Sequence, residues 1–238
     1  MTRLAIVAAL EREVKPLVKH WSVAEREYDG KRFKFFEDGV STVLVCSGIG
    51  EQAARRAAEA VIALYKPDVM QSVGFAGALD PTLRVGQIVT PWRVIDGKDG
   101  SSVNLENGSA ILLSFHSVAG AEQKSKLAKA YGAQAIDMEA AGIARVAESH
   151  GIRCMATKVI SDELDFEMPF MEHFITHDGQ FQTGRFAGFA AVRPWLWAKV
   201  IGMGRRSTKA ARSLCQELRR QLNGELKNTA ELDAGLRV

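Results

Sequence analysis

The stretch AIDMEAAGIA, residues 135–144, runs from an apolar segment into an alanine-rich one through the triplet Asp137-Met138-Glu139. Beyond the triplet, apolar residues recur at spacings of three and four, which is the stripe of a helix that packs on one face. The stretch therefore predicts a buried strand that passes directly into a helix. Acids are rarely buried without a partner, so two carboxylates at this junction predict a site that holds a ligand.

Strand-length apolar runs alternate with helical patterns on both sides of this junction. Residues 3–9 form a continuous apolar run, which suits a parallel strand buried on both faces, and residues 51–65 form a strong helical pattern. Residues 29–46 have the pattern of an antiparallel hairpin that turns at EDG. The alternation predicts an α/β fold in three layers, with a central mixed, largely parallel sheet flanked by helices.

The length of 238 residues suits one large domain. We expect a single domain over residues 1–238, with a core at 3–165 and a more irregular, helical C-terminal part at 166–238. The net charge of +3 is too small to indicate a nucleic-acid partner.

The cysteines and the hydropathy pattern indicate a cellular compartment. Cys46, Cys154 and Cys215 have no metal-ligand spacing, which favours a reducing environment and no zinc site. The apolar run before Glu11 is too short for a signal peptide, and no run reaches the roughly 18 apolar residues of a membrane span. We therefore expect a cytoplasmic protein that needs no metal or organic cofactor.

Acids and glycines follow the predicted strands, at the edge where parallel sheets bind ligands. Such an edge favours a hydroxyl-rich ligand or acid–base chemistry. Each feature also has a structural interpretation: SGIG as a tight turn, Glu13 as a helix-dipole partner, Asp162 as a helix cap. The small residues of GFAGAL, with Gly77, let a ligand or another helix approach the backbone.

Five motifs, GIGEQAARRAA, VGFAGAL, LRVGQIV, IDMEAAGIARVA and KVISDELD, occur in an order and spacing typical of one superfamily. The chain resembles the purine nucleoside phosphorylases and methylthioadenosine/S-adenosylhomocysteine nucleosidases over about residues 3–165. Its C-terminal part further resembles the hopanoid-associated phosphorylases, which act on adenosylhopane. The resemblance implies cleavage of the N-glycosidic bond of a purine nucleoside, such as a 5′-substituted adenosine, with release of adenine.

The resemblance also implies a role for each matching residue. Glu139 would accept hydrogen bonds from the ribose 2′ and 3′ hydroxyls, and Met138 would pack beneath the sugar. Asp162 would donate a proton to purine N7, with its orientation fixed by Ser161. Glu13 would activate water, as in the nucleosidases.

The base would lie against the segment from Phe115 to Val118. Two positions depart from the family pattern. Phe75 stands where relatives often carry a hydroxyl, and Lys158 stands where many carry arginine, so a bidentate contact is lost while the charge remains.

The sequence leaves the nucleophile open. Glu13 favours water, whereas the subfamily resemblance favours inorganic phosphate as co-substrate, with charge from Arg12, Arg93 or Lys158. A nucleoside-binding protein that has lost catalysis is an alternative. A dinucleotide-dependent oxidoreductase is a weaker one, because the full glycine-rich fingerprint is absent.

The C-terminal part leaves two interpretations of its aromatic residues. Residues 165–174, rich in Phe and Met, predict apolar walls for a 5′ substituent. Trp195 and Trp197, near Arg193 and Lys199, indicate either a packed helical segment or a peripheral membrane contact. A small-molecule nucleoside is the expected partner, in a homo-oligomer for which the resemblance favours a dimer.

Overall fold

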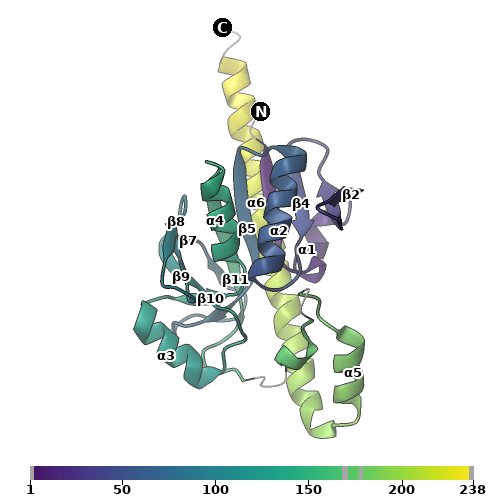
Figure 1. The fold of residues 1–238 in the computed structure, drawn as a ribbon, viewed down its shortest axis with the longest axis vertical. Helices are drawn as coiled ribbons and strands as arrows, with labels where there is room; N and C mark the ends of the chain where they lie inside the picture. Colours follow the sequence, from purple (N-terminus) through teal and green to yellow (C-terminus); the bar gives the residue numbers. More distant parts are fainter. Residues whose placement is uncertain (1–2, 168–170, 177–178, 236–238) are drawn as a thin grey trace.

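The computed structural model describes residues 3–167, 171–176 and 179–235. Over these residues, eleven strands form one mixed sheet with helices on both faces (Figure 1). The strands are β1 (Leu4–Ala8), β2 (Ser22–Tyr28), β3 (Lys31–Glu37), β4 (Thr42–Cys46), β5 (Val69–Ala78), β6 (Ile88–Val89), β7 (Pro91–Asp96), β8 (Ser102–Asn104), β9 (Ala110–Ser114), β10 (Ala135–Asp137) and β11 (Arg153–Asp162). The helices are α1 (Glu11–Val18), α2 (Glu51–Tyr65), α3 (Ala121–Tyr131), α4 (Ala140–Ser149), α5 (Thr183–Ala191) and α6 (Trp197–Gly235), with 3₁₀ turns η1 (Met171–Phe174) and η2 (Pro194–Leu196).

The sheet has the order β2-β3-β4-β1-β5-β10-β9-β7-β8, and β11 pairs with β5 and β6. Its centre is parallel: β1 pairs in this sense with β4 and β5, and β11 with β5. Antiparallel pairs lie at the margins, between β2 and β3 and between β7 and β8, and β10 runs antiparallel to the end of β5. The predicted α/β fold with a mixed sheet and flanking helices is confirmed.

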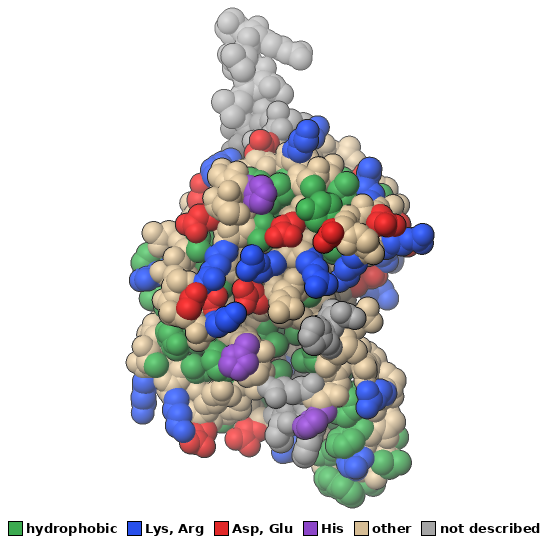
Figure 2. Space-filling model, in the orientation of Figure 1, with side chains coloured by type: hydrophobic (Ala, Val, Ile, Leu, Met, Phe, Trp, Pro, Cys, Tyr) green, Lys and Arg blue, Asp and Glu red, His purple; other side chains and the backbone are tan. Residues whose placement is uncertain are grey.

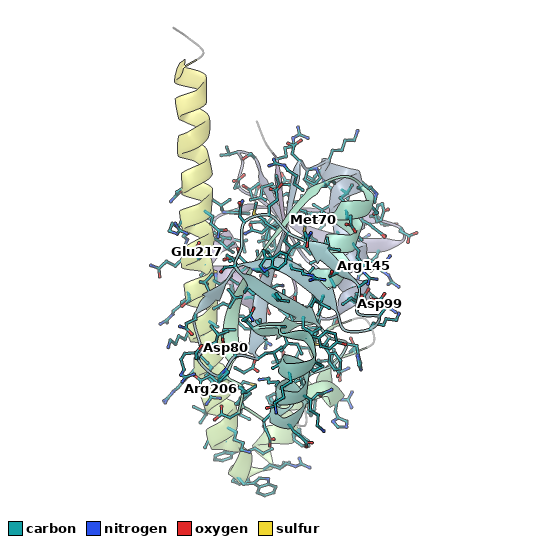
Figure 3. All side chains as sticks on the ribbon, turned by 90° about the vertical axis from the view of Figure 1, so that its left-hand side faces the viewer. Met70, Asp80, Asp99, Arg145, Arg206 and Glu217 are labelled. Carbon is teal, nitrogen blue, oxygen red and sulfur yellow. The ribbon has the colours of Figure 1, made fainter. Side chains whose placement is uncertain are left out.

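Two apolar layers hold the helices to the sheet. Ala54, Ala57 and Val61 of α2 pack with residues of α4 on one face, where small side chains allow the two helices to approach closely. On the other face, Leu214 and Leu218 of α6 pack against α1 and β11. The perpendicular view shows α6 running along the whole length of the molecule (Figure 3).

The structure differs from the sequence expectations at several element ends. The apolar stripe that reaches Trp21 predicts a longer first helix, but α1 ends at Val18 and the chain enters β2. Most residues of this strand are exposed, and Asp29 and Gly30, both at positive φ, turn the chain into β3. β11 continues through Asp162, where the sequence predicts a loop from Ser161 onward.

The C-terminal part forms a lobe of η1, α5, η2 and the start of α6, held by an aromatic cluster. Phe174 and Phe186 are buried in it, with ring centres 5.2 Å apart. Apolar side chains are also exposed at the far end of this lobe (Figure 2). Residues 168–170 of the predicted apolar wall lie outside the described residues. No described helix is both long and apolar enough to cross a membrane.

Candidate functional site

A pocket opens where β1, β5 and β11 end and where α4 begins. Parallel strands direct their carboxyl ends to the same edge, which is why residues from distant motifs meet here. Of the nine site residues predicted from the sequence, eight line this pocket, and Phe115 does not. The eight are Glu13, Phe75, Gly77, Val118, Met138, Glu139, Ser161 and Asp162.

Glu139 immediately precedes α4, and the turn before α2 holds its carboxylate. The Gly50 N–H donates to Glu139 Oε1 at 2.8 Å, and Glu139 is only 8% exposed. Gly50 has a φ of 97°, a conformation that favours glycine. The SGIG segment is thus the predicted strand-to-helix turn, and it also fixes the acid that the resemblance assigns to the ribose.

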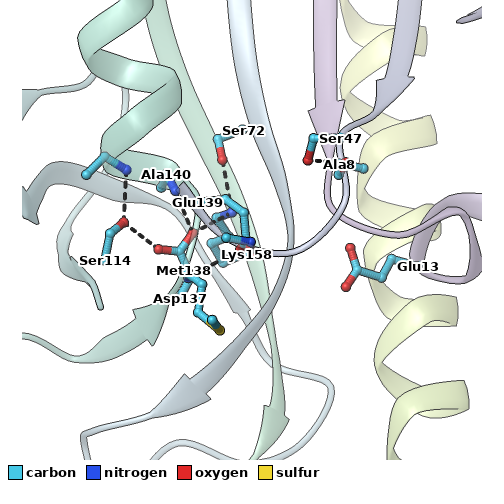
Figure 4. Close-up of polar contacts among 12 residues, drawn as sticks. Ala8, Glu13, Ser47, Ser72, Ser114, Asp137, Met138, Glu139, Ala140 and Lys158 are labelled. Atoms are coloured by element: carbon cyan, nitrogen blue, oxygen red, sulfur yellow. Dashed lines mark hydrogen bonds and ion pairs between the residues drawn. The ribbon is translucent and has the colours of Figure 1, made fainter. Parts of the chain in front are cut away.

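Asp137 caps α4 and neutralises a buried lysine (Figure 4). Its Oδ2 accepts from the Ala140 N–H at 3.0 Å and lies 2.8 Å from Lys158 Nζ, while its Oδ1 accepts from the Ser114 hydroxyl at 2.5 Å. Lys158 Nζ also donates to Ser72 Oγ at 2.9 Å. Both charged side chains are buried, so the residue that caps α4 is also half of an internal ion pair.

Three buried acids and the buried Lys158 set the electrostatics around Glu13 and Glu139. Burial, and then the charge of Asp137, raises the pKa of Glu139 to about 8 against the opposing charge of Lys158. Burial raises the pKa of Glu13 to about 7. Burial alone would lower the pKa of Lys158, but Asp137 and Glu139 raise it, so the lysine stays charged. Glu13 and Glu139 therefore titrate near neutral pH, where a side chain exchanges protons most effectively.

Glu13 lies in the first turn of α1 and is 4% exposed. A Cβ built on Gly74 would lie 2.9 Å from Glu13 Oε2, so the glycine makes room for this carboxylate. Figure 4 shows the carboxylate directed toward the buried ion pair. Glu11 suits the role of helix-dipole partner better than Glu13, because Glu11 is exposed in the same turn. It pairs with Lys34 on the surface at 3.0 Å.

Asp162 ends β11, and both of its carboxylate oxygens have partners. Ser161 Oγ donates to Oδ1 at 2.7 Å, the orienting contact that the resemblance implies. Lys124 Nζ, from α3, forms an ion pair with Oδ2. A Cβ on Gly77 would lie 2.9 Å from Asp162 Oδ2 and 3.2 Å from Lys124 Cε. Gly77 thus permits the close approach of two side chains, from α3 and from β11.

The segment predicted to hold the base divides into two environments. Val118 lines the pocket beside Met138. Phe115 instead packs in an apolar cluster with Leu113, and a Cβ on Gly97 would lie 2.9 Å from its ring. The base-stacking role of Phe115 stays a prediction, because its ring lies outside the pocket lining.

The three cations weighed as phosphate ligands have different surroundings. Lys158 is paired with Asp137, and Arg93 donates to Ser102 Oγ at 2.7 Å on the neighbouring strand without lining the pocket. Arg12 lines the pocket, with its guanidinium 5.3 Å from the centre of the Phe181 ring. Of these three cations, Arg12 alone faces the pocket.

Lys124 and Ser114 carry no motif that predicts a role for them, and both belong to the site. Besides its bond to Asp137, Ser114 Oγ accepts from the Ala141 N–H at 2.9 Å and so joins the sheet to the start of α4. Within the described part of the chain, no group of three or more His, Cys, Asp or Glu residues is arranged to hold a metal ion.

The family model described as "Phosphorylase superfamily" matches residues 3–109 and 112–179. The chain belongs to this superfamily. The matched ranges span all nine site residues predicted from the sequence. The superfamily predicted from the sequence motifs is therefore confirmed.

Curated relatives in the superfamily are nucleosidases. A 5′-methylthioadenosine/S-adenosylhomocysteine nucleosidase of Buchnera aphidicola subsp. Acyrthosiphon pisum is 26% identical over 201 residues, 68% of this chain and 86% of the relative. The enzyme of the same name from Staphylococcus aureus (strain JH9) is 26% identical, over 69% and 90% of the two chains. One from Marinomonas sp. (strain MWYL1) is 30% identical, over 40% and 42%. These relatives support an enzyme that cleaves N-glycosidic bonds.

Solved structures share the fold. The native futalosine hydrolase of Helicobacter pylori strain 26695 superposes with a TM-score of 0.70 at 14% identity, over 94% of this chain and 98% of that one. A 5′-methylthioadenosine/S-adenosylhomocysteine nucleosidase from Colwellia psychrerythraea 34H, in complex with adenine, gives 0.61 at 22% identity, over 68% and 83%. At these identities the likeness shows the fold alone, and the narrower resemblance to the hopanoid-associated phosphorylases stays a prediction.

Proposed function

We propose that this enzyme hydrolyses the N-glycosidic bond of a 5′-substituted adenosine and releases adenine. The nucleosidases among its relatives support this class of reaction. The observation that carries the proposal is the convergence of Glu13, Glu139 and Asp162 on one pocket. Bond cleavage requires three tasks, which are to hold the sugar, to protonate the base and to activate the nucleophile, and each acid suits one of them.

Glu139 is the proposed sugar ligand. The transition state of this reaction resembles an oxocarbenium ion, so the sugar acquires positive charge as the bond to the base breaks. An ionised carboxylate accepts hydrogen bonds from both hydroxyls of a cis-diol, and its charge also stabilises the developing cation. Met138, beside it in the pocket lining, supplies an apolar surface beneath the ribose.

Asp162 and Glu13 are the proposed acid and base. Adenine leaves readily only when protonated, and Asp162 would deliver the proton to N7 while its bond from Ser161 fixes the carboxyl plane. Glu13, with its pKa raised to about 7, is suited to take a proton from water at neutral pH. The resulting hydroxide attacks C1′ of the sugar.

Water is favoured over phosphate because the pocket offers little unpaired positive charge. Lys158 and Lys124 are each paired with a carboxylate, which leaves Arg12 as the cation that faces the pocket without such a pair. Glu13 and Glu139 line the same space, and in their ionised forms they would repel a phosphate dianion.

The 5′ substituent is proposed to be apolar. Phe166 and Ile175 line the pocket, and Phe166 packs against the aromatic cluster of the C-terminal lobe. Aromatic and aliphatic walls bind a thioalkyl or hydrocarbon group better than a charged one. Adenosylhopane, the substrate of the subfamily that the C-terminal part resembles, meets this requirement.

Product analysis tests the proposal. Purified enzyme is incubated with adenosine, methylthioadenosine and adenosylhopane, with and without inorganic phosphate, and the products are separated by chromatography. We expect adenine and a free ribose product in both conditions, and Asp162→Asn lowers the rate at least 100-fold. A ribose 1-phosphate product would establish phosphorolysis. Tight binding without turnover of any substrate would favour the non-catalytic alternative.

A peripheral membrane contact through the tip of the C-terminal lobe is a second proposal. Trp195 and Trp197 are 72% and 51% exposed there, and the exposed Lys199 adds positive charge. Tryptophan beside cations is typical of segments that bind the surface of an anionic bilayer. We expect co-sedimentation with anionic liposomes that Trp195→Ala/Trp197→Ala abolishes. Equal, negligible pelleting of both proteins would reject the contact.

A homodimer is proposed from the resemblance, and a cytoplasmic location is proposed from the cysteine and hydropathy patterns. Sedimentation-equilibrium measurements at several protein concentrations test the subunit number. A mass equal to that of one chain at all concentrations would reject a stable dimer.

A further inference from the structure

Lys124 is buried directly behind the proposed general acid. Its side chain is 2% exposed, whereas that of Asp162 is 26% exposed toward the pocket. Lys124 Nζ is bound to Asp162 Oδ2 and also donates to the Glu163 carbonyl oxygen at 2.8 Å. Two fixed acceptors orient the ammonium, and Gly77 leaves the space that its stem requires.

This contact places a proton donor directly against the carboxyl of Asp162. The Lys124 ammonium donates to Oδ2, and the Ser161 hydroxyl donates to Oδ1. Of these two donors, the ammonium is the stronger acid, so Lys124 is the one suited to hand a proton to Asp162.

We propose that Lys124 supplies the proton that Asp162 passes to the leaving base. The inference rests on the proposed function, in which Asp162 protonates N7. Asp162 remains the catalytic residue that touches the base, and Lys124 acts through it.

The proton transfers balance. The Nζ–H bond of Lys124 breaks, and its proton moves to Asp162 Oδ2. As the C1′–N9 electron pair moves onto the base, the Asp162 carboxyl gives that one proton to N7. After this step Lys124 is a neutral amine, Asp162 is again a carboxylate, and adenine leaves as a neutral molecule. Glu13 meanwhile holds the proton taken from water, and exchange with solvent restores both groups.

Other charged groups around the pocket act equally on the native enzyme and on Lys124 variants. Arg12 and Glu13 face it from α1, Glu139 from the start of α4, and Asp137, which pairs with Lys158, lies in its wall. On α3, Glu122 and Lys126 pair with each other at 2.7 Å on the exposed face. A ratio of rates at each pH removes these shared contributions to a good approximation.

The test compares Lys124→Met with the native enzyme between pH 5.5 and 9, by kcat and kcat/KM for adenine release. An aspartic acid without a partner has a reference pKa of about 4, so in the variant the proton is lost as the pH rises. The ratio of native to variant kcat should then increase about tenfold per pH unit over several units. Lys126→Met, an exposed lysine of the same helix, is the matched control and should leave the ratio near one.

A substrate with an activated leaving group separates proton delivery from general damage. When a 4-nitrophenyl riboside is hydrolysed, 4-nitrophenolate leaves as a stable anion and needs no proton. Lys124→Met should cleave it within about threefold of the native rate, as should Asp162→Asn. Lys124→Arg keeps the charge but cannot release its proton, so its adenine release should fall while its melting temperature is retained.

Three results would overturn the inference. If the ratio of native to Lys124→Met kcat is the same at every pH, Lys124 has a purely structural role. If Lys124→Met is faster than the native enzyme, Lys124 inhibits the reaction. Full activity of Lys124→Arg would show that its charge alone matters, and this variant decides the question if Lys124→Met does not fold. If Asp162→Asn itself releases adenine normally, the proposed function fails instead, which is a distinguishable outcome.

Discussion

Because the carboxyl of Glu13 is buried, we predict that replacing it with a neutral side chain stabilises the folded protein. The gain in unfolding free energy should depend on pH. The group is 4% exposed and its pKa is raised from 4.5 to about 7. An acid of this kind binds its proton more tightly in the folded chain than in the unfolded one. Its favourable contribution is therefore complete below pH 4.5 and is lost as the pH rises from there to about 7.

The magnitude follows from the two pKa values. At about 1.36 kcal/mol for each pKa unit, ionising Glu13 costs the folded state about 3 kcal/mol at pH 8 and about 1 kcal/mol at pH 5. Glu13→Gln keeps the shape and removes the charge. Relative to the native protein, its gain in unfolding free energy should be larger at pH 8 than at pH 5 by about 2 kcal/mol, or about 4–8 °C in Tm.

The assay is denaturation by urea and by heat at both pH values, with activity measured in parallel. Glu11→Gln is the control, because Glu11 lies on the same helix but its side chain is 46% exposed and pairs with Lys34. Glu13→Gln should also lower kcat at least 100-fold, since a neutral amide cannot take a proton from water. An equal gain at the two pH values, or the same gain from Glu11→Gln, would refute the reasoning.

Three further substitutions test individual contacts. Glu139→Gln should lower kcat/KM by about 10- to 100-fold, because hydrogen bonds to a charged group contribute about 1.5–3 kcal/mol. In this variant, removing the 2′ and 3′ hydroxyls of the substrate should lower kcat/KM little further. If the effects of the substitution and of the dideoxy substrate add, the diol contact is contradicted. Lys158→Met should lower the free energy of unfolding by about 3–5 kcal/mol, because Asp137 is left buried without a cation; denaturation in urea measures this, and a value within 1 kcal/mol of native would be contrary to it. Ser161→Ala should reduce kcat by about tenfold with KM nearly unchanged, as steady-state kinetics would reveal, whereas a change confined to KM would place the hydroxyl on the substrate instead.

Much of the site could be predicted because its residues follow strands. Glu13 and Asp162 lie where buried strands end, and parallel strands bring their ends to one edge whatever their separation in sequence. The predicted sheet and its helices required only the alternation of patterns. Glu139 was predictable because its motif joins a strand to a helix.

Lys124 was not predictable from the sequence alone. It is one of three lysines in α3, with Lys126 and Lys129, and the helical stripe does not mark which of them is buried. Its burial depends on the path of α3 across the ends of β5 and β11, which only the tertiary structure fixes. The position of the Phe115 ring likewise depends on Gly97, which lies on a different segment.

β2 was missed because it carries no strand pattern on its own. SVAEREY contains three consecutive charged residues and is mostly exposed at the edge of the sheet, and its pairing with β3 arises from the turn at Asp29 and Gly30. Trp21, which extends the apolar stripe of α1, is instead half-buried and packs on the apolar layer that contains Leu214 and Leu218 of α6.

The hydrogen bond from Gly50 to Glu139 has a consequence for how the pocket fills. Burial raises the pKa of the Glu139 carboxyl to about 8 despite the N–H donors of Gly50 and Met138, so at pH 7 the pocket without nucleoside holds it mainly as the neutral acid. A ribose diol brings two more donors, which favour the carboxylate. Binding of an uncharged nucleoside should therefore expel close to one proton into the buffer. The enthalpy of binding then depends on the buffer's own heat of ionisation, and occupancy of the pocket becomes a function of the acidity of its surroundings.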